Sequence, residues 1–91
     1  MNPKDLAIDL LRPYIERGET GKQILNSCLG SGSREVDIMC NPKYVWDYAI
    51  EKLLYKAKPD EVVVQYPDDR FFVFKMSELE QSILSGQLSM F

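Results

Sequence analysis

The chain has 91 residues, of which 45% are hydrophobic and 27% are charged, and its formal net charge is −3. This length supports one domain with a single core, and this composition excludes a chain that is disordered throughout. The weak negative charge argues against a protein that binds nucleic acid through its overall charge. No apolar run approaches the roughly 18 residues that a membrane-spanning helix needs, so no membrane span is expected.

The sequence contains no histidine and two cysteines, Cys28 and Cys40. Histidine is the side chain best suited to proton transfer near neutral pH and a common metal ligand. A hydrolase or a zinc site can be built without it, but its absence favours carboxylate pairs or carboxylate–metal sites. The cysteine spacing matches no metal-binding motif and indicates reduced thiols. The first residues also lack the layout of a signal peptide. A cytoplasmic protein without cofactor, metal or catalytic site is therefore expected.

Asn2 and Pro3 predict the start of the first helix, because they place a cap residue before a proline at the first helical position. Pro13 lies about three turns further on, where it removes a hydrogen bond, so it predicts a kink or break near Leu11. Gly18 is the expected end of this helical region.

A second, short helix is predicted by Thr20 and Gln23, which have the spacing of a capping box, and Gly30 is its expected end. The stretch 30–33 reads as a flexible loop. Residues 35–40 alternate exposed and apolar positions, which predicts a half-buried strand.

The longest predicted helix covers residues 42–57 and begins at Asn41-Pro42, a second cap-and-proline pair. Its apolar residues recur at helical spacing and are expected to form the central core helix. They are Trp46, Ala49, Ile50, Leu53, Leu54 and Ala57.

A β-hairpin is predicted by two apolar runs, 62–64 and 71–74, joined by a turn at 67–69. Because both runs are apolar on both faces, the hairpin is expected to be covered on each side or to lie centrally in the sheet. Ser77 and Glu80 then predict a capping box for a last helix, and Gly86 is its expected end.

The predicted fold is α+β, with a small three-stranded antiparallel sheet, a long central helix and three shorter helices. Residues 1–86 form the single globular domain, and 87–91 form a flexible C-terminal tail.

Two segments resemble a phosphate-binding loop and a nuclease core, but each lacks residues that the motif requires. The segment 18–22 resembles a phosphate-binding loop, but two residues rather than four separate its glycines and Gln23 follows the lysine. Asp60 and Lys75 resemble part of a metal-dependent nuclease core, but Val73 stands where the second carboxylate is needed.

On the predicted long helix, Tyr44, Tyr48, Lys52 and Tyr55 form an aromatic stripe beside a positive charge. These residues form a second candidate surface, for a protein partner or for stacked bases. The interpretation we prefer is that these rings cover the sheet and that their hydroxyl groups reach water.

The last five residues, Gln87-Leu88-Ser89-Met90-Phe91, combine a polar start with two large apolar side chains. Apolar residues at a free end gain little burial within their own chain. This pentapeptide resembles the motif by which bacterial replication and repair proteins dock on the DNA polymerase sliding clamp (β clamp). The resemblance covers these five residues alone. It implies that Gln87 hydrogen-bonds in a polar subpocket, that Leu88 and Ser89 hold the backbone extended, and that Met90 and Phe91 fill an apolar pocket.

The function expected from this resemblance is a small non-enzymatic adaptor or modulator of DNA replication or repair. It would bind the clamp, touch nucleic acid only indirectly, and suit a phage or mobile element. The alternative is a small inhibitor or antitoxin-like protein that acts through its globular surface, with the C-terminal residues packed on its own core.

Overall fold

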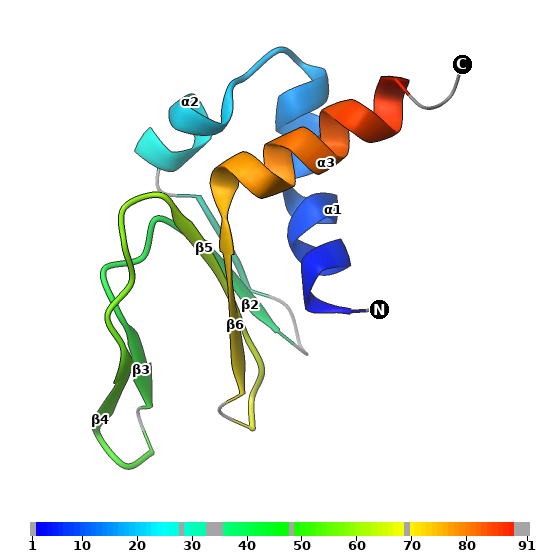
Figure 1. Ribbon diagram of the computed structural model, residues 1–91. Helices are drawn as coiled ribbons and strands as arrows, with labels where there is room; N and C mark the ends of the chain where they lie inside the picture. The colour runs from blue at the N-terminus through cyan, green and yellow to red at the C-terminus, as the bar shows by residue number, and fades with distance from the viewer. Residues whose placement is uncertain (1, 28, 33–35, 48, 69, 89–91) are drawn as a thin grey trace.

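The computed structural model describes residues 2–27, 29–32, 36–47, 49–68 and 70–88, with the backbone alone at 30–32, 87 and 88. Helices and antiparallel strands are both present, so the predicted α+β class is confirmed (Figure 1). In chain order the elements are α1 (Pro3–Glu16), α2 (Gly21–Asn26), β1 (Gly30–Gly32), β2 (Asp37–Cys40), β3 (Val45–Asp47), β4 (Lys52–Tyr55), β5 (Glu61–Gln65), β6 (Phe71–Lys75) and α3 (Met76–Leu88).

The described strands form two sheets rather than the single three-stranded sheet that the sequence predicted. Four strands pair antiparallel in the order β1-β2-β5-β6, and β3 pairs with β4 alone. The expected loop at 30–33 was wrong for residues 30–32, because Gly30–Gly32 pairs with β2 in the register Gly30↔Met39. The strand predicted at 35–40 is confirmed for Asp37–Cys40, and the predicted hairpin is confirmed as β5 and β6. Its expected position was right for β5 and wrong for β6, which lies at the edge of the sheet with Phe72 exposed.

The two N-terminal helices begin where their capping signals predicted. The Asn2 side chain accepts a hydrogen bond from the Asp5 amide at 2.9 Å, and Thr20 and Gln23 form the expected capping box. Of the kink or break predicted near Leu11, the break was wrong, because α1 continues through Pro13 to Glu16. Pro13 lies on the exposed side of α1, and the buried Ile15 holds the last turn against the core. The second helix ends at Asn26 rather than at Gly30.

The long central helix predicted at 42–57 was the largest error, because this segment forms the β3–β4 hairpin. Asn41 and Glu51 have positive φ angles of 57° and 53°, a conformation that no α-helix contains. The Asp47 carboxylate accepts hydrogen bonds from the amides of Ala49 and Ile50, which closes a turn. An apolar pattern that fits a helix therefore folds as two short strands, without a central helix among the described residues.

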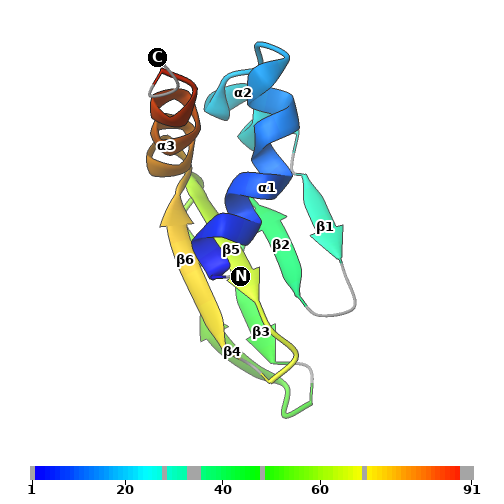
Figure 2. The same ribbon diagram turned by 90° about the vertical axis from the view of Figure 1, so that its right-hand side faces the viewer.

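The main core lies between the four-stranded sheet and the helices. α1 packs on β2, β5 and α3, and Figure 2 shows it crossing one face of the sheet. α2 and α3 pack on each other at one end of that sheet. The buried cluster comprises Ala7, Leu11, Ile15, Ile24, Val36, Ile38, Cys40, Val62, Val64, Met76, Leu79 and Ile83.

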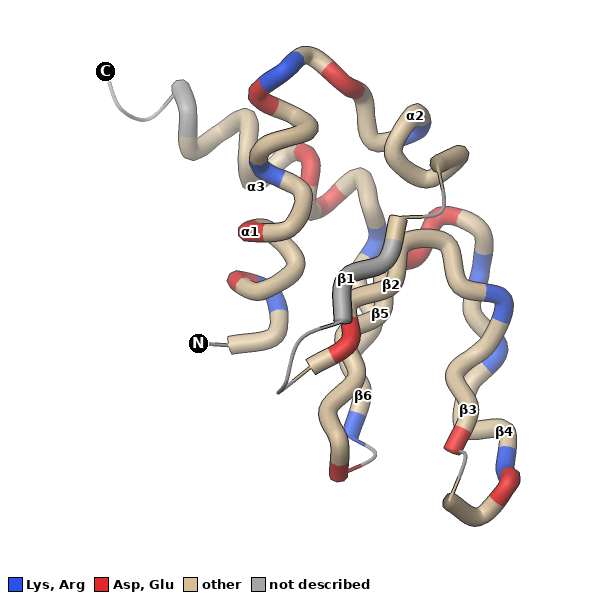
Figure 3. Tube along the Cα trace, turned by 180° about the vertical axis from the view of Figure 1, so that it is seen from behind, with Lys and Arg blue, Asp and Glu red and all other residues tan. Residues whose placement is uncertain are grey.

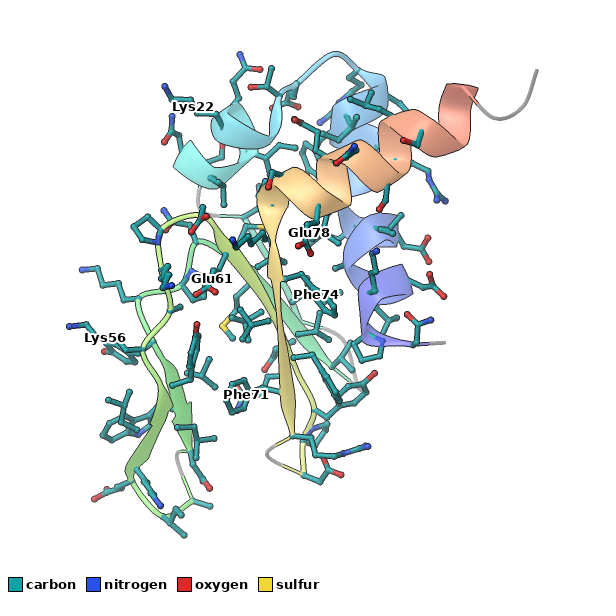
Figure 4. The ribbon with its side chains drawn as sticks, viewed as in Figure 1. Lys22, Lys56, Glu61, Phe71, Phe74 and Glu78 are labelled. Carbon is teal, nitrogen blue, oxygen red and sulfur yellow. The ribbon has the colours of Figure 1, made fainter. Side chains whose placement is uncertain are left out.

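The other face of the sheet is partly covered by the β3–β4 hairpin, which we call the arm (residues 45–47 and 49–55). Val63 is fully buried and points away from the helix side, because strand side chains alternate. Tyr55 of the arm contacts Phe71 of β6 with ring centroids 5.7 Å apart. In Figure 4, Phe71 points to the arm side of β6 and Phe74 points to the α1 side.

Candidate functional site

The predicted docking peptide begins inside α3. The helix runs through Gly86 to Leu88, so the prediction that Gly86 ends it was wrong. Leu79 and Ile83 anchor the earlier turns in the core, and a glycine in an exposed last turn costs too little to stop the helix. Gln87 and Leu88 therefore have helical backbone, whereas the predicted site residues Ser89, Met90 and Phe91 lie outside the described residues.

The predicted aromatic stripe does not lie on one helix, because Lys52 and Tyr55 belong to β4 and Tyr44 precedes β3. Tyr44 and Lys52 are exposed, whereas the Tyr55 side chain turns toward the sheet. Tyr48 lies outside the described residues.

The arm and Tyr44, the residue just before it, nevertheless carry apolar side chains that are exposed or partly exposed. We call Tyr44, Trp46, Ile50 and Leu53 the outer surface of the arm. Trp46 pairs with Leu53 across the two strands, and the rings of Tyr44 and Trp46 meet edge to face at 6.2 Å. Ile50 is 64% exposed and Leu53 is 47% exposed. The sequence predicted Trp46, Ile50 and Leu53 as core residues of a long helix. Instead, Trp46 and Leu53 pair across two strands, and Ile50 and Leu53 are exposed.

The base of the arm is fixed by a buried carboxylate. Glu61 is only 7% exposed, and its side chain accepts hydrogen bonds from the Tyr55 hydroxyl at 2.8 Å and from the Lys58 amide at 2.6 Å. The hydrogen bond to Glu61 raises the pKa of Tyr55 above its ordinary value of 10.0, and burial and the negative charges of Glu61 and Asp60 act in the same direction. This network holds Tyr55 inward and so orients the outer surface of the arm.

A shallow hollow of about 370 Å³ lies beside the arm base. Its lining is mostly apolar, from Pro42, Tyr44, Ala57 and Pro59, with Lys43 and Lys56 at its sides. Figure 3 shows lysine positions along the arm and its base, and Lys56 points outward in Figure 4. Exposed apolar groups and lysines therefore meet at the arm and its base.

The segment that resembles a phosphate loop has a packing role. The Glu80 carboxylate accepts a hydrogen bond from the Gly21 amide, the group that a bound phosphate would need. A Cβ atom on Gly21 would lie 2.7 Å from Cγ of Met76, so only glycine fits this contact between α2 and α3. The capping box predicted at Ser77 and Glu80 is replaced by this link, because α3 begins at Met76 and Glu80 caps α2 instead.

The nuclease-like residues are also tied into the fold. The backbone carbonyl of Asp60 accepts a hydrogen bond from the Met76 amide at 2.9 Å. In the part of the chain that the structure describes, no three His, Cys, Asp or Glu side chains are grouped to hold a metal ion. None of the described helices has the length and apolar character to cross a membrane.

No protein-family model matches this chain, and no curated protein or solved structure matches it.

Proposed function

We propose that this protein is a small non-enzymatic adaptor or modulator of DNA replication or repair that binds the bacterial sliding clamp through residues 87–91. The single observation that carries the proposal is the sequence Gln87-Leu88-Ser89-Met90-Phe91, which matches the clamp-docking pentapeptide at all five positions. The proposed partner is a protein, any contact with DNA is indirect, and the proposed location is the bacterial cytoplasm.

The course of α3 supports this proposal. Leu84, Ser85 and Gly86 are all exposed, and Figure 1 shows the last turn of α3 reaching beyond α1 and the sheet. A pentapeptide that follows this turn starts away from the main core. Docking of the whole motif in an extended form requires Gln87 and Leu88 to leave the helix. Helix ends fray readily, and Gly86 lowers the cost further because glycine is a poor helix former.

The energetic expectation is a modest affinity. Five residues bury a small area, and the cost of ordering them is subtracted from the gain. A dissociation constant in the micromolar range corresponds to a binding free energy of about −7 to −8 kcal/mol. Met90 and Phe91 supply most of the apolar contact in this scheme, and Gln87 sets the register.

A second candidate function rests on the arm. Tyr44, Ile50 and Leu53 of its outer surface are all exposed, and an exposed apolar patch is typical of a protein-interaction site. A small inhibitor or antitoxin-like protein would use this surface and would not need residues 87–91.

The test is a titration of a purified bacterial clamp with three forms of the intact chain. We expect the unmodified protein to bind with micromolar affinity, the Met90→Ala/Phe91→Ala double variant to lose at least about tenfold in affinity, and the arm variant Leu53→Ala to bind normally. Equal binding by the double variant, or no binding by the unmodified protein at about 100 μM, contradicts the proposal. Circular dichroism of all three forms checks that each is folded.

A further inference from the structure

β6 is an edge strand whose outer side faces no other described strand. The sheet order places β5 on one side of β6, and Figure 2 shows β6 at the outer margin of the sheet. An edge strand presents a row of backbone amides and carbonyls that can pair with another strand.

The hydrogen-bond pattern shows which residues of β6 point outward. The Tyr66 amide donates to the Arg70 carbonyl at 2.8 Å, and the Met76 amide donates to the Asp60 carbonyl at 2.9 Å. These two bonds lie at opposite ends of the β5–β6 ladder, whose register is unbroken between them. Alternate residues bond to the same neighbour in an antiparallel pair, so Phe72 and Phe74 bond to β5. The amides and carbonyls of Phe71, Val73 and Lys75 therefore point away from the sheet.

This edge lacks the features that commonly prevent edge-to-edge pairing. No proline or bulge interrupts Phe71–Lys75, and its one charge, Lys75, stands at the end of the strand. Phe72 is 38% exposed although its ring packs edge to face on Tyr66 at 6.0 Å. The strand thus combines available hydrogen-bonding groups with an exposed aromatic ring.

We propose that β6 pairs antiparallel with β6 of a second copy of this chain, about a two-fold axis at Val73. The two sheets then form one continuous sheet of eight strands, four from each copy. Among the registers open to this edge, only the one centred on Val73 pairs all five residues of β6 with all five of its partner. It places Val73 opposite Val73, Phe71 opposite Lys75, and Phe72 opposite Phe74.

The strand is self-complementary in this register, which favours a second copy over an unrelated strand. Each Lys75 lies opposite a Phe71 ring, an arrangement that suits a cation–π contact, and the two lysines are at opposite ends of the interface. Aromatic pairs across strands are stabilising, and Phe72 and Phe74 form two of them by symmetry. Arg70 of one copy is brought toward the start of α3 in the other, where Glu78 supplies the opposite charge.

The interface is small, so the dimer is weak. Two five-residue strands and their neighbouring rings bury less than the roughly 1,200 Å² of a stable complex. We expect a concentration-dependent equilibrium between monomer and dimer, with a dissociation constant of about 10–100 μM.

The test is sedimentation of the full chain across this concentration range, with two variants at one position. Val73→Pro removes an outward amide that β5 does not use, and proline is tolerated at such edge positions, so the domain should stay folded. Val73→Thr keeps the amide and nearly the same shape. We expect the unmodified chain and Val73→Thr to dimerise, and Val73→Pro to dimerise at least about tenfold more weakly.

Amide hydrogen exchange of the unmodified chain tests the same interface without a variant. We expect the amides of Phe71, Val73 and Lys75 to exchange more slowly as the concentration rises. Those of Phe72 and Phe74 should be protected at every concentration, because β5 already holds them. A chain that stays monomeric to about 1 mM, or a dimer that leaves the three outward amides unprotected, overturns the proposal.

Discussion

The Tyr55–Glu61 hydrogen bond has a consequence for stability at high pH. The pKa of the Tyr55 hydroxyl in the folded protein is raised above the unfolded value of 10.0, so the folded protein holds the phenol proton more tightly than the unfolded chain does. The resulting stabilisation is complete below pH 10 and is lost as pH rises through the folded-state pKa. The neutral phenol is thus part of the structure that fixes the arm to the sheet.

We therefore expect the free energy of unfolding to fall as pH rises above about 10, and to fall less in Tyr55→Phe, which has no proton to lose. Tyr44→Phe is the matched control, because Tyr44 is exposed and should leave the pH dependence of the parent unchanged. Denaturant titrations between pH 8 and pH 11.5 measure the effect. Parallel pH profiles for all three proteins would show that the Tyr55 hydroxyl does not contribute.

At the scale of elements, two glycines that look alike in sequence have opposite roles. Gly21 lies where α2 meets α3, and an added Cβ would come within 2.7 Å of Met76 and 3.0 Å of Glu80. Gly86 lies in the last turns of α3, and an added Cβ there meets nothing within 4 Å. The first glycine is required by packing, and the second only weakens a helix.

We expect Gly21→Ala to lower the free energy of unfolding by about 1–3 kcal/mol, because the contact between α2 and α3 must move apart. Gly86→Ala should raise the stability slightly, by at most about 0.5–1 kcal/mol, because alanine favours the helical backbone. Urea denaturation of both variants beside the parent measures the difference. A destabilised Gly86→Ala would contradict a helix that continues through this position.

The elements that the sequence predicted correctly are those whose residues favour only one kind of secondary structure. The valines of β5, the phenylalanines of β6 and the proline-containing turn between them have no helical alternative, and the caps of α1 and α2 depend on residues three apart in sequence. The segment 42–57 has apolar residues at helical spacing, yet it folds as a hairpin that leaves Ile50 and Leu53 exposed and buries Asp47. Its choice depends on the positive φ angles at Asn41 and Glu51 and on contacts such as the Asn41 amide with the Glu61 carbonyl, which form only in the folded chain.

One candidate site can be predicted from the sequence alone, whereas the others depend on how the strands pair. The proposed docking peptide is a linear motif, so residues 87–91 resemble it whatever the fold. The outer surface of the arm depends on the register that pairs Trp46 with Leu53, and no periodicity in the sequence indicates that register. The edge of β6 likewise needs the strand order, because the same phenylalanine run would be buried in the middle of a sheet.

At the scale of the whole molecule, the two proposals combine into a quantitative expectation. A dimer through β6 carries two copies of residues 87–91, and the clamp is a ring with identical pockets. If both peptides of one dimer reach pockets at once, the second binding step becomes intramolecular and the apparent affinity rises without any new contact. This gain in apparent affinity for the clamp requires the dimer, whereas the affinity of one peptide for one pocket is the same in monomer and dimer.

We therefore expect Val73→Pro, loaded on a densely immobilised clamp at about 100 μM, to dissociate at least about tenfold faster than the unmodified chain loaded in the same way. Below the dimer dissociation constant, the two proteins should bind a dilute clamp equally, because both then act through one peptide. Surface-binding measurements at high and low clamp density separate these regimes. Equal binding in both regimes would leave the peptide as a single-site ligand, and weaker binding by Val73→Pro in both would show that β6 itself contacts the clamp.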